Sequence, residues 1–243
     1  MKQGKWVILK TGATFADIRR RWGDFEDWVL AYAGLKGDDT VVVDACKHEQ
    51  LPENQDILGV IITGSHAMMT DASEWIDTAI RWVRQLVEGR VPVLGICFGH
   101  QLLATAIGGS VDYHPLGREV GTTDVRLTPS GCQDVLFANL PVVFPAHTTH
   151  AQSVLRLPKA AMVLGANAFE PHHALRIDPC AWGVQFHPEF SADVMRAYID
   201  RQSSDLRKEG HDVEVLRSRV VDTPASNNLL KAFVAFAARH LPA

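Results

Sequence analysis

Residues 93–101 read VLGICFGHQ and place Cys97 between Gly95 and Gly99, each two positions away. An apolar run typical of a buried strand ends at this cysteine, and a helix-like stretch follows it. A nucleophile on a sharp strand-to-helix turn needs small residues two positions before and after it, because larger side chains would collide with the turn. The start of the helix would favour a thiolate, and the backbone N–H of Phe98 would be free to bind an oxyanion. Taken alone, Gly-x-Cys-x-Gly fits a buried structural cysteine equally well.

A second motif supplies the partners that a cysteine nucleophile needs. Residues 182–190 read WGVQFHPEF, with His187 at the end of a strand-like run and Glu189 two positions later. In extended backbone, residues i and i+2 point to the same side, and Pro188 restricts the residue before it to an extended conformation. We therefore predict that His187 acts as base toward Cys97 and that Glu189 orients the imidazole and stabilises its charge.

Weaker candidates lie near these two motifs. The apolar run 57–63 ends before Gly64 and Ser65, either of which could offer a second backbone N–H to an oxyanion. His66 and His100 lie close to the same loops. We predict that each is a loop or helix-surface residue rather than a catalytic base.

Several histidines and cysteines raise the question of a metal site, and their spacing does not favour one. No cysteine and no tight acidic cluster accompanies the histidines His147, His150, His172 and His173. The cysteines are scattered along the chain at Cys46, Cys97, Cys132 and Cys180. We therefore predict no metal site and no disulfide framework, and free thiols in a reducing cytoplasm.

The composition excludes several classes of protein. The 243 residues are 47% hydrophobic and 21% charged, with a net charge of -4. This balance gives no electrostatic reason to expect nucleic acid or an anionic membrane as partner. The N-terminus lacks the apolar segment of a signal peptide, and no apolar stretch approaches the roughly 18 residues that a membrane span needs.

The elements that must position the motifs alternate between strands and helices in the first half of the chain. Short apolar runs predict strands at residues 5–10, 40–45, 57–63 and 91–97. Residues 73–90 have apolar side chains at helical spacing, with Ser73 as N-cap and Gly89 as stop. Continuous apolar strands linked by helices imply a parallel sheet covered on both faces.

The second half of the chain has a different pattern of apolar and turn residues. From about residue 117, short strand-like runs split by turn residues predict extra strands at 119–128, 153–158, 161–167, 173–178 and 181–189. Helical patterns follow at 191–210 and 226–241. We predict an α/β fold and a single domain over residues 1–243, with a motif-bearing core at about 55–192 and C-terminal helices at about 191–243.

The chain resembles the triad type of the class I glutamine amidotransferase family, in the stand-alone group similar to the amidotransferase domain of GMP synthase. The resemblance is carried by PVLGICFGHQLLATAIGG and GVQFHPEF, and extends through GVIITGS, PLGREVG and HAQSVLRLP. It implies a flavodoxin-like open sheet, mostly parallel, with extra antiparallel strands. It also implies an enzyme without a cofactor, whose thiolate attacks the side-chain amide of glutamine, forms a thioester and releases ammonia and then glutamate.

The resemblance also implies roles for particular residues. Cys97 is the nucleophile, His187 the general base and acid, and Glu189 its orienting partner. Gly64 and Phe98 match the oxyanion positions. Residues matching the glutamine pocket are Gln101, His150, Ala151 and Gln152.

Two departures from the family pattern leave the substrate open. Gln152 falls where an aspartate usually stands, and residues 63–65 read Thr-Gly-Ser where the family often has two glycines and a proline. The chain also contains no phosphate-binding loop of a synthetase, so ammonia either passes to a separate synthetase subunit or hydrolysis is the whole reaction. Three hypotheses follow: the glutaminase component of an amidotransferase, a γ-glutamyl peptidase or hydrolase, and a non-catalytic regulatory protein on the same fold.

Overall fold

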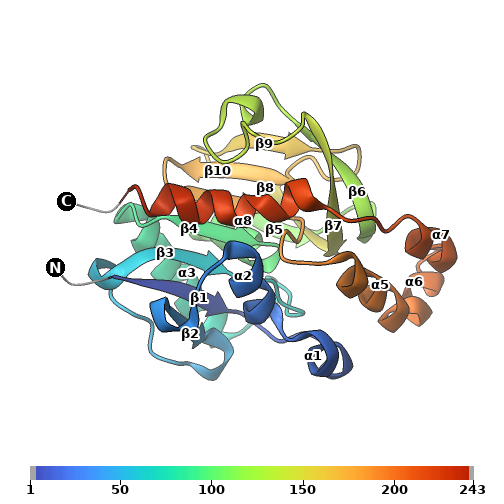
Figure 1. The fold of residues 1–243 in the computed structure, drawn as a ribbon, viewed down its shortest axis with the longest axis horizontal. Helices are drawn as coiled ribbons and strands as arrows, with labels where there is room; N and C mark the ends of the chain where they lie inside the picture. Colours follow the sequence, from blue (N-terminus) through green and yellow to red (C-terminus); the bar gives the residue numbers. More distant parts are fainter. Residues whose placement is uncertain (1–3, 241–243) are drawn as a thin grey trace.

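A computed structural model describes residues 4–240, with the side chains of Asp56 and Asp178 excepted, and is drawn in Figure 1. Within this range the main sheet has nine strands in the order β2-β1-β3-β4-β11-β10-β9-β6-β7. Its first five strands are parallel to one another. They are β2 (Thr40–Asp44), β1 (Lys5–Lys10), β3 (Ile57–Ile62), β4 (Val93–Ile96) and β11 (Ala181–Val184). The four strands predicted in the first half of the chain are confirmed.

The other part of the sheet is antiparallel, which confirms the extra antiparallel strands predicted for the second half. It consists of β10 (Ala174–Asp178), β9 (Met162–Ala166), β6 (Glu119–Leu127) and β7 (Val143–His150). A separate two-stranded sheet pairs β5 (Ser110–Tyr113) with β8 (Gln152–Arg156). Strands β5 and β7 were not predicted from the sequence.

Helices cover both faces of the parallel strands, because alternate residues of each strand point to opposite faces. In β1, Trp6 and Ile8 belong to one apolar core, and Val7 and Leu9 belong to the other. The first core contains side chains of α2 (Phe25–Ala33) and α8 (Pro224–Ala237), and Figure 1 shows α8 crossing the near face of the sheet with α2 beside it. The second core contains side chains of α3 (Glu74–Glu88) and α4 (Phe98–Ala106).

Helix α3 confirms the helix predicted over residues 73–90. Ser73 occupies its N-cap position but its side chain accepts no capping hydrogen bond, and Gly89 follows its last residue. The helix predicted over 191–210 is instead two helices that meet at Gln202. The helix predicted over 226–241 begins earlier, at Pro224, and residue 241 lies outside the described residues.

The remaining helices are short. Helices α5 (Ala192–Arg201), α6 (Ser203–Lys208) and α7 (Val213–Ser218) gather near β6, and α1 (Ala16–Trp22) packs against α5. The 3-10 helices are η1 (Gly37–Asp39), η2 (Ala45–Lys47), η3 (Asn54–Asp56) and η4 (Gly131–Gln133). None of the helices in residues 4–240 is both long and apolar enough to cross a membrane.

The register of the parallel strands brings several loops to one edge of the sheet. Ile62 of β3 pairs with Gly95 of β4, and Ile96 of β4 pairs with Val184 of β11. The segments that follow β3, β4 and β11 therefore leave the sheet side by side at its carboxyl edge. Open α/β sheets bind their ligands at this edge.

Candidate active site

The residues after β4 form the sharp turn that the sequence predicts. Cys97 has a φ of 49° and a ψ of −101°, a conformation that non-glycine residues rarely adopt. Both neighbouring glycines are required by close backbone contacts. A Cβ on Gly95 would collide with the carbonyl oxygen of Gly99, and a Cβ on Gly99 would lie 2.5 Å from the carbonyl oxygen of Ile62. The turn therefore holds the sulfur at the carboxyl edge of the sheet, where α4 begins.

The turn after β11 brings a histidine and a carboxylate to the same place. Nδ1 of His187 lies 2.8 Å from Oε1 of Glu189, and both side chains are buried. Burial alone would lower the pKa of His187, but the charges of Glu189 and then of Cys97 raise it to about 10. The imidazole is therefore cationic at neutral pH. Its Nε2 has no hydrogen-bond partner among residues 4–240, which leaves this atom available to the cysteine sulfur or to a substrate.

The position of His187 is fixed from several sides. Its backbone N–H donates to the carbonyl oxygen of His147 over 2.8 Å, and the ring of Phe190 stacks on the imidazole with centroids 4.2 Å apart. From α8, the Asn227 side chain donates to the carbonyl oxygens of Pro188 and Phe190, at 2.7 and 3.1 Å. These contacts hold the whole turn rather than one side chain.

The loop after β3 passes close to the imidazole. A Cβ on Gly64 would lie 2.9 Å from Cε1 of His187, so only glycine allows this approach. The backbone N–H groups of Gly64, Ser65 and Phe98 donate no hydrogen bond to any other part of the described chain. The hydroxyl of Ser65 donates to the carbonyl oxygen of Thr11 over 2.6 Å, which anchors the loop. Backbone donors are thus available on both sides of the sulfur.

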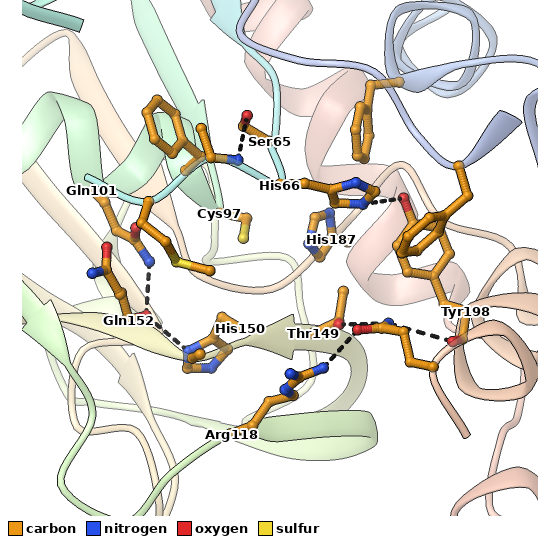
Figure 2. A pocket seen from close by; sticks show the side chains of 17 residues that line it. Ser65, His66, Cys97, Gln101, Arg118, Thr149, His150, Gln152, His187 and Tyr198 are labelled. Carbon is orange, nitrogen blue, oxygen red and sulfur yellow. Dashed lines mark hydrogen bonds between the residues drawn. The ribbon is translucent and has the colours of Figure 1, made fainter. Parts of the chain in front are cut away.

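Three of the predicted substrate-binding residues, Gln101, His150 and Gln152, form one connected group, and Figure 2 shows Gln101 and Gln152 on the side of Cys97 away from His187. The Nε2 of Gln101 donates to the carbonyl oxygen of Gln152 over 2.7 Å, and Nδ1 of His150 lies 3.1 Å from that same oxygen. The other ring nitrogen of His150 lies 3.1 Å from a carboxylate oxygen of Glu119. Burial alone would raise the pKa of Glu119, but hydrogen bonds from His150 and His173 hold it well below its usual range.

The side chain of Gln152 is used within the protein. Its Oε1 accepts from the backbone N–H of Met69 over 2.8 Å, and its Nε2 donates to Oγ1 of Thr70 over 2.7 Å. Both ends of the amide therefore hold the loop that follows β3. This arrangement gives Gln152 a structural task at the position where the sequence suggested substrate contact.

A cavity of about 230 Å³ lies over these loops. The predicted site residues that line it are Ser65, Cys97, Phe98, Gln101, His150, Ala151, Gln152 and His187. Gly64 and Glu189 do not line the cavity. The other lining residues are Phe15, Phe25, His66, Ala67, Met68, Arg118, Thr149, Tyr198 and Gln202. The lining thus contains a cationic side chain, Arg118, and no carboxylate.

Most of this second set was not singled out from the sequence. Phe15 follows the first predicted strand, so the rule that ligands bind beyond the carboxyl ends of parallel strands could have indicated it. Arg118 lies within the PLGREVG segment that carries the family resemblance. Tyr198 lies in a predicted amphipathic helix, and no local signal distinguishes it from a core residue.

One histidine prediction is wrong. His100 was expected on a helix surface, but it is fully buried in α4. The cause is close packing against β11, where a Cβ on Gly183 would lie 2.5 Å from Nδ1 of His100. His66 is an exposed loop residue, as expected, and it lines the cavity. Within residues 4–240, no three histidine, cysteine or acidic side chains are grouped as a metal site requires.

Comparison with known proteins shows the family to which the chain belongs. The model of the class-I glutamine amidotransferases matches residues 27–204. The chain belongs to this family. The matched segment contains β3, β4, β11 and the loops that hold Gly64, Cys97, His187 and Glu189, whereas the cavity-lining residues Phe15 and Phe25 precede it.

The relatives of this chain are named for different activities. One subunit of the glutamine-hydrolyzing GMP synthase of Methanococcus vannielii is 30% identical over 76% of this chain and 87% of its own length. Gamma-glutamyl peptidase 4 of Arabidopsis thaliana is 26% identical over 82% of this chain and 81% of its own length. Longer proteins named glutamine-hydrolyzing GMP synthase also match, and the chain spans between 20% and 34% of their length.

A solved structure has the same fold. The crystal structure of a glutamine amidotransferase of Thermotoga maritima superposes with a TM-score of 0.77, covering 96% of this chain and 98% of that one at 19% identity. The mostly parallel sheet with added antiparallel strands is therefore the fold of class I amidotransferases.

Proposed function

We propose that this chain is a Cys-His-Glu enzyme that hydrolyses the side-chain amide of glutamine to glutamate and ammonia. The observation that carries the proposal is the arrangement of Cys97, on its strained turn, beside the buried His187–Glu189 pair. A decayed, non-catalytic relative would have no need to keep all three groups. A strained backbone at a cavity is a common feature of active sites.

The reaction proceeds in two steps on these groups. The sulfur of Cys97 attacks the side-chain carbonyl carbon, and the backbone N–H groups of Gly64 and Phe98, with Ser65 as an alternative donor, bind the oxyanion. The C–N bond then breaks as Nε2 of His187 gives its proton to the departing nitrogen, leaving a γ-glutamyl thioester. Water, deprotonated by the imidazole, attacks the thioester and releases glutamate and the free thiol. No step needs a cofactor or a metal ion.

The partners follow from the same mechanism. The substrate is a small molecule, bound by Gln101, by Arg118 and by the segment of His150, Ala151 and Gln152. The similarity to one subunit of a GMP synthase supports a separate, ammonia-accepting synthetase as partner. We place this function in a single cytoplasmic domain without contact to nucleic acid or membrane.

The test is ammonia release from glutamine, coupled to glutamate dehydrogenase, by the purified chain. Wild type should release ammonia and glutamate in equal amounts, whereas Cys97→Ser should release neither. Cys132→Ser is the matched control, because Cys132 is exposed and does not line the cavity. If neither glutamine nor any other γ-glutamyl compound is turned over, and Cys97 fails to react with a glutamine-like electrophile, the non-catalytic alternative replaces this proposal.

A second candidate, hydrolysis of γ-glutamyl conjugates, is favoured by one specific observation. The aromatic side chains of Phe15, His66 and Tyr198 line the cavity together with Cys97, and ammonia, the leaving group of glutamine, does not need such a surface. The similarity to a γ-glutamyl peptidase supports the same candidate. This candidate predicts higher kcat/KM for γ-glutamyl conjugates than for glutamine, and the reverse ranking would exclude it.

A further inference from the structure

One end of the cavity has an aromatic wall built from three separate parts of the chain. Phe15 comes from the loop after β1, His66 from the loop after β3, and Tyr198 from α5. The ring centroids of Phe15 and His66 are 4.3 Å apart, and those of Phe15 and Tyr198 are 5.4 Å apart. We refer to these three residues as the aromatic wall. All three line the same cavity as Cys97.

Within the aromatic wall, Tyr198 is buried and held by polar contacts, whereas Phe15 and His66 are accessible. The Tyr198 ring is buried, and its hydroxyl lies 2.6 Å from Oγ1 of Thr14 and 3.4 Å from Nε2 of His66. Phe15 is only partly buried and His66 is exposed. Burial, followed by the positive charge of His187, lowers the pKa of His66, so its ring is neutral at neutral pH. The wall therefore presents uncharged ring surface to the cavity.

The chemistry of the site decides which part of a substrate meets this wall. The nitrogen that leaves must receive its proton from His187, so the leaving group has to lie on the His187 side of Cys97. Figure 2 shows Gln101 and Gln152 on one side of Cys97, and His187, His66 and Tyr198 on the other. The γ-glutamyl part therefore lies toward Gln101, and the leaving amine lies toward the aromatic wall.

Ammonia, the leaving group of glutamine, needs no apolar surface. An amine that carries an apolar ring would bury that ring against the wall, and burial of apolar surface is favourable in proportion to its area. Binding sites for small molecules are typically lined by apolar side chains, with a few polar groups that fix the orientation of the ligand.

We propose that the aromatic wall is a subsite for the amine half of the substrate, which makes γ-glutamyl amides of apolar, ring-bearing amines the preferred substrate class. This inference rests on the proposed hydrolase function and specifies its substrate. The bond broken is the γ-glutamyl C–N bond. The amine nitrogen takes the proton of His187 and departs, and water then releases glutamate from the Cys97 thioester.

The test compares two secondary amides that differ only at the wall, γ-glutamyl benzylamide and γ-glutamyl methylamide. Since a single methylene in an apolar pocket discriminates by about tenfold or more, the benzylamide should exceed the methylamide at least about tenfold in kcat/KM. His66→Ala, at an exposed position, and Phe15→Ala should each bring this ratio close to one. Tyr113→Ala is the matched control, because Tyr113 is an exposed aromatic residue outside the cavity, and it should keep the wild-type ratio.

Binding of both amides to Cys97→Ala, measured by calorimetry, separates the two proposals. Hydrolysis of the methylamide without preference for the benzylamide overturns the subsite and leaves the hydrolase function intact. A preference that persists in both His66→Ala and Phe15→Ala also overturns it. A third outcome is that wild type hydrolyses neither amide, yet Cys97→Ala binds the benzylamide more tightly than the methylamide. If this binding preference is lost in the double variant Cys97→Ala/His66→Ala, the hydrolase function fails and the subsite stands. Equal binding of the two amides in that case refutes both.

Discussion

Replacement of Gly64 by alanine tests whether catalysis depends on the exact place of the imidazole. The new Cβ would lie 2.9 Å from Cε1 of His187. Non-bonded carbon atoms are most stable at about 3.5–4.0 Å, so the ring must withdraw by about 0.6 Å or more. The ring has little freedom to do so, because Glu189 holds Nδ1 at 2.8 Å and Phe190 stacks on its face. A misplacement of about 1 Å costs about 100-fold in rate, so we expect kcat/KM to fall between about 10- and 100-fold.

The effect should be larger on activity than on folding. Gly64 does not have a positive φ, so alanine is compatible with its backbone, and the overpacking against His187 should cost about 1–3 kcal/mol and lower the melting temperature by several degrees only. The matched control is Gly37→Ala, since a Cβ there meets nothing within 4 Å and the backbone is likewise compatible. The assay is kcat/KM for glutamine beside a thermal melt of each variant. A Gly64→Ala enzyme with activity within about twofold of wild type would refute the argument that the close approach of Gly64 fixes the position of the His187 imidazole.

Three further changes test other contacts. Glu189→Gln removes the charge that chiefly raises the pKa of His187, so the alkaline limb of the pH–rate profile should move to lower pH and activity at neutral pH should fall about 10³- to 10⁴-fold. Asn227→Ala removes two hydrogen bonds to carbonyl oxygens beside His187 and should lower the free energy of unfolding in urea by about 1–3 kcal/mol, whereas exposed Asn228→Ala should not. The carboxylate of Glu119 has a pKa below its usual value of 4.5, so the stability that it contributes is present above that pH and lost as the pH falls. Urea unfolding at about pH 6 and about pH 3.5 should therefore show a smaller acid loss in Glu119→Gln than in wild type, and equal losses would contradict this.

The parallel strands could be predicted because their sequences are apolar on both faces. Such runs have no solvent side, which identifies central strands of an α/β sheet. Strand β7 was missed because residues 143–150 read VFPAHTTH, where a proline and two histidines hide the pattern. Helix α2 was missed although its signals were present: Asp24 forms a capping box with Asp27, and Gly34 ends the helix in the left-handed region.

One part of the site, the turn around Cys97, could be predicted from the sequence, and another part, the role of Gln152, could not. The turn around Cys97 is determined mainly locally, because a Cβ on Gly95 would collide with Gly99, four positions later, and only the collision at Gly99 involves the neighbouring strand β3. The structural task of Gln152 could not be inferred in this way. Its partners Met69 and Thr70 are more than 80 positions earlier and come close only after the sheet has formed.

This difference explains why the chemistry of the chain is easier to predict than its substrate. The reacting groups follow β4 and β11, which are adjacent parallel strands, so the register of one sheet edge is sufficient to bring Cys97 and His187 together. The aromatic wall depends instead on how Tyr198 of α5 packs onto Phe15, a contact between residues more than 180 positions apart. Side chains placed by long-range packing carry no short sequence signal, and in our proposal they are the ones that face the leaving group. In the proposed reaction, the residues at the edge of the sheet determine which bond is broken, and the flanking loops and helix α5 determine which amine leaves.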